Sequence, residues 1–507
     1  MQDFEIHLAD EAATTNFGED LALTIAPGDC LALTGDLGAG KSALSRALIR
    51  ALANDTDLEV PSPTFTLVQT YETRVPVAHF DLYRLADESE LAELGLDEAL
   101  ERGAALIEWP DRAGSQLPSN RVEIEITHEG SGRKLVLRGG SERFQARFAR
   151  VRAIRDFLDA NGYRGAHRRY LTGDTSFRCY ERIEHGERKR VVMDSPARPN
   201  GPPVRDGKPY SQLVHLAEDV RPFIAVGRYL ENVGLSAPHI YEIDMDQGIL
   251  IIEDLGSEGV LDAEGKPIAE RYEEAIRCLA DFHKRKPPVT LTVEDEAEHV
   301  VPSFDRETLR FEVELLLDWH LPWRRGTPAS DAERRDYLAI WDHLIDELES
   351  VEKRLVLRDY HSPNILWRGD RDGLDRIGII DFQDAIIGPS SYDVVSLSQD
   401  ARVTVERPLM ERLIAIYCDL RAADGSGFDK ALFEKSFAIM SAQRACRLNG
   451  LWVRLKQRDN LAAYMRHMPR TLWHLSMAFE HPITADLKDW CRRAGVSTDI
   501  SPEKLAS

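Results

Sequence analysis

The chain has 507 residues, of which 43% are hydrophobic and 30% are charged, and its formal net charge is −22. This composition is typical of an ordinary globular protein and excludes an intrinsically disordered one. The length predicts roughly three domain-sized units. The negative charge disfavours broad, non-specific adhesion to nucleic acid or to an anionic membrane, although local basic patches remain possible.

The six cysteines are scattered along the chain without metal-ligand spacing. Such a distribution is typical of reduced, mostly buried thiols in a reducing compartment. The first residues lack the basic and apolar regions of a signal peptide. No apolar run approaches the ~20 residues that a membrane helix needs. We therefore expect a cytoplasmic protein with no membrane contact.

A phosphate-binding loop is predicted near the N-terminus. The apolar run 30–34 is expected to form a buried strand, and it leads into residues 35–42, which read GDLGAGKS and match the P-loop pattern in full. Apolar residues at helical spacing follow. Glycines would let backbone N–H groups face the phosphates of ATP, a lysine would reach the β- and γ-phosphates, and a serine would ligate Mg²⁺. The residues concerned are Gly35, Gly38, Gly40, Lys41 and Ser42.

Two acidic residues follow predicted strands downstream of this loop. Asp81 ends the run 77–80, and Glu108 ends the run 104–107. A P-loop needs a further acidic group that holds the metal or orients water, so both residues are candidates for a hydrolytic site. A solvated acid after a buried strand is the alternative for each. Upstream of them, Thr64 lies in a proline-fixed loop that could sense the γ-phosphate, or could simply be a connecting turn.

Four segments resemble, in order, TsaE, the small ATPase subunit of bacterial threonylcarbamoyladenosine synthesis. They are the loop 35–42, Ser62-Pro63-Thr64-Phe65, His79-Phe80-Asp81-Leu82-Tyr83-Arg84-Leu85 and Ile107-Glu108-Trp109-Pro110. The resemblance covers residues 1–139 and implies a small α/β P-loop fold whose ATP hydrolysis supports modification of adenosine 37 in tRNA. It also implies partners, the transferase subunit TsaD and its partner TsaB, and hence indirect contact with tRNA.

The resemblance to TsaE also implies roles for individual residues. Carried over by position, Lys41 and Ser42 would bind phosphate and Mg²⁺. Thr64, Asp81 and Glu108 would belong to the hydrolytic site, with Glu108 also beside the metal. Trp109 would contribute to partner contacts or to the response to nucleotide.

A domain boundary is predicted at residues 139–141, which read Gly-Gly-Ser. Beyond it, apolar residues recur every three or four positions between 144 and 157 and are flanked by five arginines, which predicts an amphipathic helix with a basic outer face. The arginines could dock another surface or tRNA, but a solvated helix face is the favoured interpretation. We expect domains at 1–140 and 141–507, close together because the linker is short.

The strongest chemical signature of the second domain lies between residues 357 and 384. Asp359 and Asn364 stand five residues apart in a predicted loop, and an apolar strand then delivers Asp381 at its end. Phosphotransferases need one carboxylate that orients and deprotonates the acceptor hydroxyl, and an amide and a second carboxylate that hold Mg²⁺ on ATP. A surface loop and an acidic strand end are each common alone. Their conjunction is rarer and indicates phosphoryl transfer.

A hairpin that would cover ATP is predicted at residues 169–180, with Gly173, Asp174 and Ser176 at its tip. A buried strand that ends at Glu253 could pair its backbone with the adenine edge, where the chain crosses between lobes. The strand 190–194 carries no lysine at the position that holds the α- and β-phosphates in kinases. The groups that would replace it are left open: Lys189, Arg190 or the hairpin backbone.

From about residue 145 to 490 the chain resembles the aminoglycoside phosphotransferase branch of the protein-kinase-like superfamily. Within it, the chain looks most like AmgK, the cell-wall kinases of N-acetylmuramate and N-acetylglucosamine. The segments that carry this resemblance are 171–178, 192–196, 381–385, Gly388-Pro389, Tyr392-Asp393 and Gln443-Arg444. It implies an α+β bilobal fold, with an N-lobe at about 145–255 and a C-lobe at about 256–500. The implied reaction is transfer of phosphate from ATP to the anomeric hydroxyl of a recycled amino sugar.

By position in this family, Asp359 would be the catalytic base, Asn364 and Asp381 the Mg²⁺ ligands, and Asp393 a brace of the catalytic loop. Aminoglycosides are polycations and need an acidic pocket, whereas N-acetylmuramate carries a carboxylate that favours a guanidinium with an aromatic platform. Arg444 and Arg454 in the C-terminal helices favour the amino sugar, or are merely surface arginines. Asp384 is a candidate for positioning sugar or metal, with loop ordering as an equal alternative.

These observations predict a bifunctional fusion of a tRNA-modification ATPase with an amino-sugar kinase, both using ATP and Mg²⁺. One alternative is a kinase of an aminoglycoside or another small hydroxyl substrate. Another is a regulatory scaffold that binds nucleotide without turnover. The fusion itself could be a simple joining of adjacent genes, without any coupling free energy between the two sites.

Overall fold

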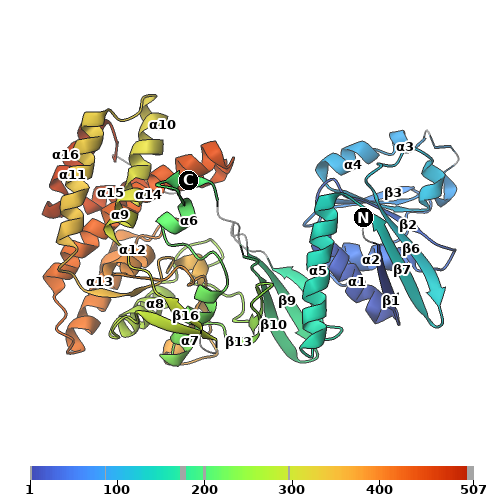
Figure 1. Cartoon of the computed structure of the whole chain (residues 1–507), viewed down its shortest axis with the longest axis horizontal. Helices are drawn as coiled ribbons and strands as arrows, with labels where there is room; N and C mark the ends of the chain where they lie inside the picture. Colours follow the sequence, from blue (N-terminus) through green and yellow to red (C-terminus); the bar gives the residue numbers. More distant parts are fainter. Residues whose placement is uncertain are drawn as a thin grey trace. The chain divides into compact units, whose positions relative to one another are not determined.

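The computed structural model describes residues 3–85, 87–88, 90–171, 178–197, 201–294 and 297–498. The chain divides into two compact units (Figure 1). The first comprises Met1–Ser195 and Glu242–Asp254, and the second comprises Pro196–Tyr241 and Leu255–Ser507. No helix of the described ranges is both long and apolar enough to cross a lipid bilayer. All six cysteines are free, and five of them are buried, as the sequence predicted.

The N-terminal part of the first unit is built on a seven-stranded sheet in the order β1-β7-β6-β2-β5-β4-β3. Its strands are β1 (Phe4–Leu8), β2 (Cys30–Thr34), β3 (Val68–Tyr71), β4 (Val77–Asp81), β5 (Ala104–Glu108), β6 (Val122–Glu129) and β7 (Gly132–Gly139). The central strands β6, β2, β5 and β4 run parallel. Every residue of β4 and β5 is buried, which explains why these strands read as continuous apolar runs.

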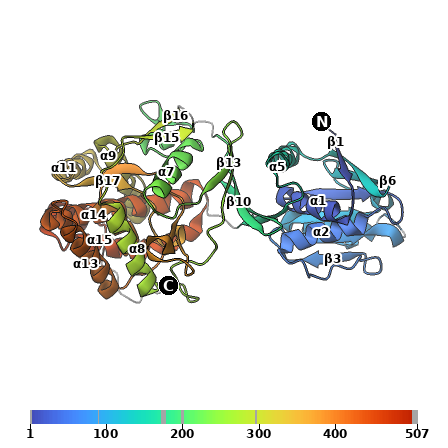
Figure 2. The same ribbon diagram turned by 90° about the horizontal axis from the view of Figure 1, so that it is seen from below.

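The side chains of this sheet alternate between two hydrophobic cores. Leu31, Leu33 and Leu106 belong to one core, and Cys30 and Ile107 belong to the other. The helices of this part are α1 (Glu11–Thr24), α2 (Lys41–Ala53), α3 (Glu90–Glu93) and α4 (Leu96–Arg102). Helices α1 and α2 lie side by side (Figure 2) and contribute to the first core.

Helix α5 (Glu142–Ala160) follows the predicted boundary directly. Gly139 and Gly140 adopt positive φ angles of 75° and 83°, and the side chain of Ser141 caps the helix by accepting a hydrogen bond from the backbone of Phe144. The prediction that the basic face of this helix is solvated is wrong for three of its arginines. Arg155 is buried, and Arg147 and Arg150 form hydrogen-bonded ion pairs, because acidic residues distant in the sequence fold against them.

The first unit also contains a five-stranded antiparallel sheet in the order β13-β14-β10-β9-β8. Its strands are β8 (His167–Leu171), β9 (Cys179–His185), β10 (Arg188–Asp194), β13 (Ile240–Asp244) and β14 (Ile249–Glu253). The predicted hairpin corresponds to β8 and β9. Gly173, Asp174 and Ser176, expected at its tip, lie outside the described residues.

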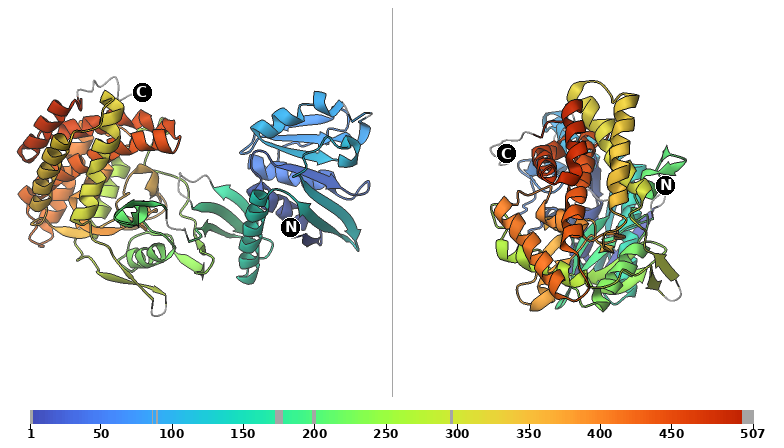
Figure 3. Two further views of the ribbon diagram at one scale, coloured as in Figure 1. Left: turned by 45° about the horizontal axis from the view of Figure 1, so that its top comes forward. Right: turned by 90° about the vertical axis from the view of Figure 1, so that its left-hand side faces the viewer.

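The second unit is mainly helical (Figure 3). Its helices are α6 (Tyr210–Leu213), α7 (Arg221–Asn232), α8 (Ala269–Phe282), α9 (Arg306–Leu315), α10 (Leu321–Arg325), α11 (Asp331–Glu347), α12 (Ser391–Ser398), α13 (Arg407–Ala423), α14 (Lys430–Arg458), α15 (Met468–Ala478) and α16 (Ala485–Ala494). Its short strands are β11 (Pro203–Arg205), β12 (Lys208–Pro209), β15 (Thr290–Glu294), β16 (Ala297–Val300), β17 (Lys353–Val356), β18 (Ile365–Trp367), β19 (Ile377–Ile379) and β20 (Ile386–Pro389).

The long helix α14 passes through the core of this unit and packs against α9, α12 and α15. Its Gly450 allows the close approach to α9, since an added Cβ would lie 2.2 Å from the carbonyl of Leu315. The pairs β17–β20 and β18–β19 flank the loop that was predicted to be catalytic.

Candidate functional sites

The first site lies at the carboxyl ends of β2, β5 and β4. Lys41 opens α2 directly after Gly40, whose φ of +114° is one that side chains rarely adopt. The Lys41 ammonium donates to the carbonyl oxygens of Gly35 at 2.7 Å and Asp36 at 3.0 Å. It also lies 3.8 Å from the ring centroid of Trp109. Burial lowers the pKa of this lysine.

Glu108 ends β5 and is only 1% exposed. One of its carboxylate oxygens accepts a hydrogen bond from Ser42 Oγ at 2.8 Å, and the other accepts one from Ser45 Oγ at 3.0 Å and lies 2.9 Å from Nε2 of His79. Ser45 and His79 had no predicted role. Their spacing offered a signal, because Ser45 lies one helical turn after Ser42, and His79 shares a face of β4 with Asp81.

Asp81 ends the neighbouring strand β4 and is paired in register with Glu108. One carboxylate oxygen accepts hydrogen bonds from the hydroxyls of Ser62 and Thr64, each at 2.6 Å. Burial would raise the pKa of Asp81, but these bonds and one from the backbone of Tyr83 bring it below its usual value. The carboxylate is therefore charged at neutral pH.

A cavity of about 260 Å³ adjoins the P-loop. Residues of the loop, of α1 and of the β6–β7 hairpin line it, among them Gly40, Thr14 and Arg133. Arg133 of β7 donates from Nε to the carbonyl of Ala39 at 2.7 Å and so helps to fix the conformation of the loop. Sequence reasoning missed Arg133, because 94 residues separate it from Ala39.

The second site is the loop after β17. Asp393 is fully buried and accepts hydrogen bonds from the backbone N–H groups of Leu357 at 2.6 Å and Arg358 at 2.9 Å. Arg358 has a φ of +67°, so the carboxylate holds a strained turn directly before Asp359. This geometry agrees with the bracing role expected for Asp393.

The structure brings Asp359, Asn364 and Asp381 together. The Asn364 side-chain nitrogen donates to the carbonyl of Asp359 at 3.0 Å and to the carboxylate of Asp381 at 3.3 Å. Asp381 has a φ of +60°, and Gln383 donates to its other oxygen at 3.0 Å. Asp384 accepts from the backbone of Ala217 at 2.6 Å, which agrees with its loop-ordering alternative.

Asp359 lies in a strongly cationic environment. Burial would raise its pKa, but the charge that His361 carries when protonated and the charges of nearby arginines bring it below the usual value of an aspartate. Two of these arginines, Arg444 and Arg447, lie on α14. Asp359 is therefore a charged carboxylate at neutral pH. Burial lowers the pKa of His361.

Three buried or half-buried arginines, Arg358, Arg444 and Arg447, lie close to Asp359, and a fourth, Arg454, lies further along α14. Glu312 of α9 is 0% exposed and accepts a hydrogen bond from Arg358 at 2.9 Å, and it lies 3.5 Å from Arg447. Arg444 and Arg454 are buried, and the Nε atom of each has no hydrogen-bond partner among the described residues. The guanidinium of Arg454 stacks 4.2 Å from the ring centroid of Tyr210.

Both sites offer oxygen donors of the kind that Mg²⁺ prefers. Ser42 and Glu108 provide a hydroxyl and a carboxylate in the first site, and Asn364 and Asp381 provide an amide and a carboxylate in the second. Within the described ranges no cluster of three or more His, Cys, Asp or Glu side chains could hold a metal ion. A Mg²⁺ ion bound chiefly through nucleotide phosphates needs only one or two such protein ligands, so the residues present fit it.

Comparison with known families gives two matches on different parts of the chain. Residues 8–135 match the family described as threonylcarbamoyl adenosine biosynthesis protein TsaE, and residues 167–429 match the phosphotransferase enzyme family. The chain belongs to both families. It is thus a fusion of a TsaE domain, a P-loop ATPase, with a phosphotransferase domain of protein-kinase-like α+β fold.

Relatives are similar to one half or the other. An N-acetylmuramate/N-acetylglucosamine kinase of Caulobacter vibrioides is 31% identical over 352 residues, which are 66% of this chain and 94% of that one. A tRNA threonylcarbamoyladenosine biosynthesis protein TsaE of Rickettsia bellii is 39% identical over 120 residues, 24% of this chain and 83% of that one. The solved choline kinase LicA of Streptococcus pneumoniae is 14% identical, with a TM-score of 0.42, and the match covers 64% of this chain and 98% of that one.

Proposed function

We propose that the phosphotransferase domain is an ATP-dependent kinase of the anomeric hydroxyl of N-acetylmuramate and N-acetylglucosamine. The observation that carries the proposal is the convergence of Asp359, Asn364 and Asp381 within one loop system. The names of relatives such as the Caulobacter vibrioides kinase support the choice of sugar. The reaction would serve recycling of cell-wall sugars in the cytoplasm.

In the proposed reaction Asp359 orients the sugar hydroxyl and accepts its proton. The hydroxyl oxygen forms a bond to the γ-phosphorus of ATP, the bond from that phosphorus to the β–γ bridging oxygen breaks, and ADP leaves with the electron pair. Asn364 and Asp381 would hold Mg²⁺, which when bound neutralises charge on the phosphates. Asp384 would order the adjoining loop through its hydrogen bond with Ala217. It would also help to position the sugar or the metal.

Arg444 and Arg454 would bind the anionic group of the sugar. Their buried guanidinium groups form no ion pair with the described residues, whereas Glu312 already pairs with Arg358 and Arg447. A lactyl carboxylate would supply the missing charge, and Tyr210 beneath Arg454 would provide an aromatic surface. A polycationic aminoglycoside would be repelled by this cluster, which disfavours the antibiotic-kinase alternative.

In the kinase N-lobe, Gly173, Asp174 and Ser176 remain proposed nucleotide contacts outside the described residues, and Glu253 remains one at the end of β14. Where kinases carry a lysine, Asp194 instead accepts hydrogen bonds from Arg150 at 2.5 and 3.0 Å.

For the TsaE domain we propose ATP hydrolysis that supports formation of threonylcarbamoyladenosine at position 37 of tRNA, in a complex with TsaD and TsaB. Support comes from relatives of that name and from the shared site of Ser42 and Glu108. Lys41, with the backbone of Gly35, Gly38 and Gly40, would bind the phosphates. Asp81 would position Thr64 beside the γ-phosphate through the hydrogen bond between them.

A single substrate panel tests the kinase proposal. The full-length protein is incubated with ATP, Mg²⁺ and each of N-acetylmuramate, N-acetylglucosamine and kanamycin, and the products are identified by ³¹P NMR. We expect an anomeric sugar phosphate from both amino sugars and no phosphorylated kanamycin. Phosphorylation of kanamycin alone would establish the antibiotic-kinase alternative, and no product with any acceptor would favour the scaffold alternative.

A further inference from the structure

Helix α5 contributes to two hydrophobic cores at once. Its first turns place Phe144 and Phe148 in the core of the seven-stranded sheet, where the ring of Phe148 lies 4.9 Å from that of Phe4. Its last turns place Ile154 and Leu158 in the core of the five-stranded sheet. A single continuous helix therefore joins the TsaE domain to the sheet of the phosphotransferase domain.

A buried ion network crosses the same junction. Asp20 of α1 is 2% exposed and accepts hydrogen bonds from Arg155 of α5 at 2.8 and 3.1 Å. It also accepts one from Arg168 of β8 at 2.8 Å. Arg168 is 1% exposed and pairs in turn with Glu181 of β9 at 2.8 and 3.0 Å. The carboxylate of one domain thus pairs with two guanidinium groups of the other, and Glu181 supplies the second negative charge.

Glu19 extends the network to the backbone of the edge strand β8. One of its carboxylate oxygens accepts a hydrogen bond from the backbone N–H of Arg168 at 2.9 Å, and the other lies 2.8 Å from Nδ1 of His167. On the flank, Arg147 donates to the carbonyl of Thr24 at 2.7 Å and to Asp29 at 2.5 Å. The contacts are therefore distributed over the whole junction.

The charges in this network depend on each other across the junction. A charge buried without a partner is strongly unfavourable, because its desolvation is no longer offset. Without α1, Arg155 would keep only the carbonyl of Ala166, at 2.7 Å, as a hydrogen-bond acceptor among the described residues. Arg168 would lose one of its two carboxylates. Helix α1 therefore supplies part of the negative charge that balances the buried Arg155 and Arg168.

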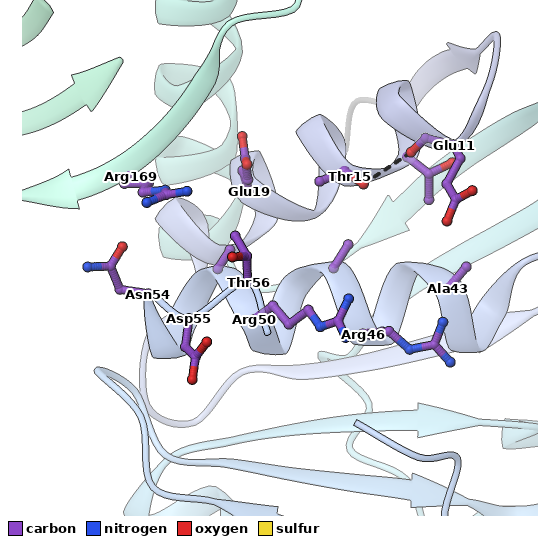
Figure 4. A pocket seen from close by; sticks show the side chains of 13 residues that line it. Glu11, Thr15, Glu19, Ala43, Arg46, Arg50, Asn54, Asp55, Thr56 and Arg169 are labelled. Atoms are coloured by element: carbon purple, nitrogen blue, oxygen red, sulfur yellow. Dashed lines mark hydrogen bonds between the residues drawn. The ribbon is translucent and has the colours of Figure 1, made fainter. Parts of the chain in front are cut away.

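Helix α1 also connects this network to the nucleotide loop. Gly18 faces α2 so closely that an added Cβ would lie 2.5 Å from Cβ of Ala47, and α2 begins with the P-loop residue Lys41. Figure 4 shows the pocket between α1 and α2, with Glu19 and Arg169 of β8 at one end. Helix α1 is thus packed between the P-loop helix and the phosphotransferase sheet.

We propose that the TsaE domain and the five-stranded sheet of the phosphotransferase domain form one cooperative folding unit, joined by α5 and by the Asp20–Arg155–Arg168 network. Nucleotide bound at the P-loop then stabilises β8 and β9 as well as its own domain, because a ligand stabilises every segment that opens in the same cooperative unit. Fusion of the two chains consequently has an energetic role, beyond the activities proposed for either half.

Hydrogen exchange of the full-length protein tests this proposal. Amide exchange of β8 and β9 is followed by mass spectrometry, with and without ADP–Mg²⁺, in the wild type, Asp20→Asn and the matched variant Asp156→Asn. Asp156 lies on the outer face of α5, with a side chain 71% exposed. We expect exchange in β8 and β9 to rise at least tenfold in Asp20→Asn and to stay unchanged in Asp156→Asn, whereas α14 is unaffected in both.

The second arm isolates the P-loop nucleotide. All proteins carry Asp381→Asn, so that nucleotide binding at the kinase site is weakened equally, and Lys41→Ala removes binding at the P-loop. Protection of β8 by ADP–Mg²⁺ should then fall at least fivefold in Lys41→Ala. Equal protection with and without Lys41, or equal exchange in Asp20→Asn and Asp156→Asn, would overturn the proposal. If Asp20→Asn does not fold, Glu19→Gln replaces it with the same criteria.

Discussion

The side-chain amide of Asn364 lies 3.3 Å from the carboxylate of Asp381, because the pairing of β18 with β19 brings the start of one strand beside the end of the other. The same amide nitrogen contacts the carbonyl of Asp359 at 3.0 Å. This arrangement ties the proposed metal ligands to the proposed base, so that binding of the metal and placement of the acceptor hydroxyl depend on one loop.

Asp381→Asn should weaken the binding of Mg²⁺ at the kinase site, so that sugar phosphorylation needs a higher Mg²⁺ concentration. The substitution keeps the shape of the side chain and removes the charge that would hold the metal. We expect the Mg²⁺ concentration for half-maximal rate to rise by roughly 10–100-fold, the usual range for metal sites that lose a supporting group. Asp372→Asn, in the exposed turn before β19, is the control and should behave as the wild type.

Arg454→Gln should discriminate between the two sugars. The carboxylate of N-acetylmuramate would lose a hydrogen bond to a charged group, which contributes about 1.5–3 kcal/mol. The KM for N-acetylmuramate should therefore rise roughly 10–100-fold. N-acetylglucosamine lacks that carboxylate, and its KM should change less than threefold. Arg458→Gln, one turn along α14 and 52% exposed at its side chain, serves as the control. An equal loss for both sugars would contradict a role in carboxylate recognition.

The pH profile of kcat/KM should have its acidic limb below the usual aspartate pKa. The cationic surroundings of Asp359 lower its pKa, so protonation of this base begins only at more acidic pH. Its contribution to stability has the same sign: it is present above the unfolded pKa and is lost as pH falls through the lower folded value. Rates measured from pH 7 down to pH 5 should therefore show no loss from this group. An acidic limb of kcat/KM with its half-maximal point above pH 5, present in the wild type and absent in Asp359→Asn, would contradict the lowered pKa of Asp359.

Glu108→Gln should abolish ATP hydrolysis by the TsaE domain and spare sugar phosphorylation. The carboxylate of Glu108 forms hydrogen bonds with Ser42, Ser45 and His79. Its charge would hold the metal or orient the attacking water. We expect a loss of roughly 100–10,000-fold in phosphate release without sugar, the range for removal of an acid–base group. Glu101→Gln on the exposed face of α4 is the control. Unchanged hydrolysis would place the activity elsewhere.

Much of both sites was predictable from the sequence because their chemistry is local. The P-loop glycines, Lys41 and Ser42 are adjacent in the chain, and the spacing of Asp359 and Asn364 is fixed by one short loop. Asp81 and Glu108 were also predicted from a local signal, since each follows an apolar run. Parallel pairing of β4 with β5 then brings the two carboxylates to one edge of the sheet.

The remaining contacts depend on pairs that are distant in the sequence. The bond from Arg168 to Asp20 spans 148 residues, and the bond from Arg358 to Glu312 spans 46. Interpretation of the hydrophobic pattern assigns arginines to the surface, so the basic side of α5 was predicted to be solvated. Only the tertiary fold supplies the acidic partners that allow Arg155 to be buried.

The most direct test of the proposed kinase mechanism is the rate of anomeric phosphorylation of N-acetylmuramate by the full-length Asp359→Asn protein. We expect a fall in kcat of roughly 100–10,000-fold, with Mg²⁺–ATP binding and ATP hydrolysis by the TsaE domain retained. The control Asp370→Asn, exposed in the turn after β18, should keep the wild-type rate. Wild-type sugar phosphorylation by Asp359→Asn would contradict the proposed role of Asp359 and, with it, the proposed kinase mechanism.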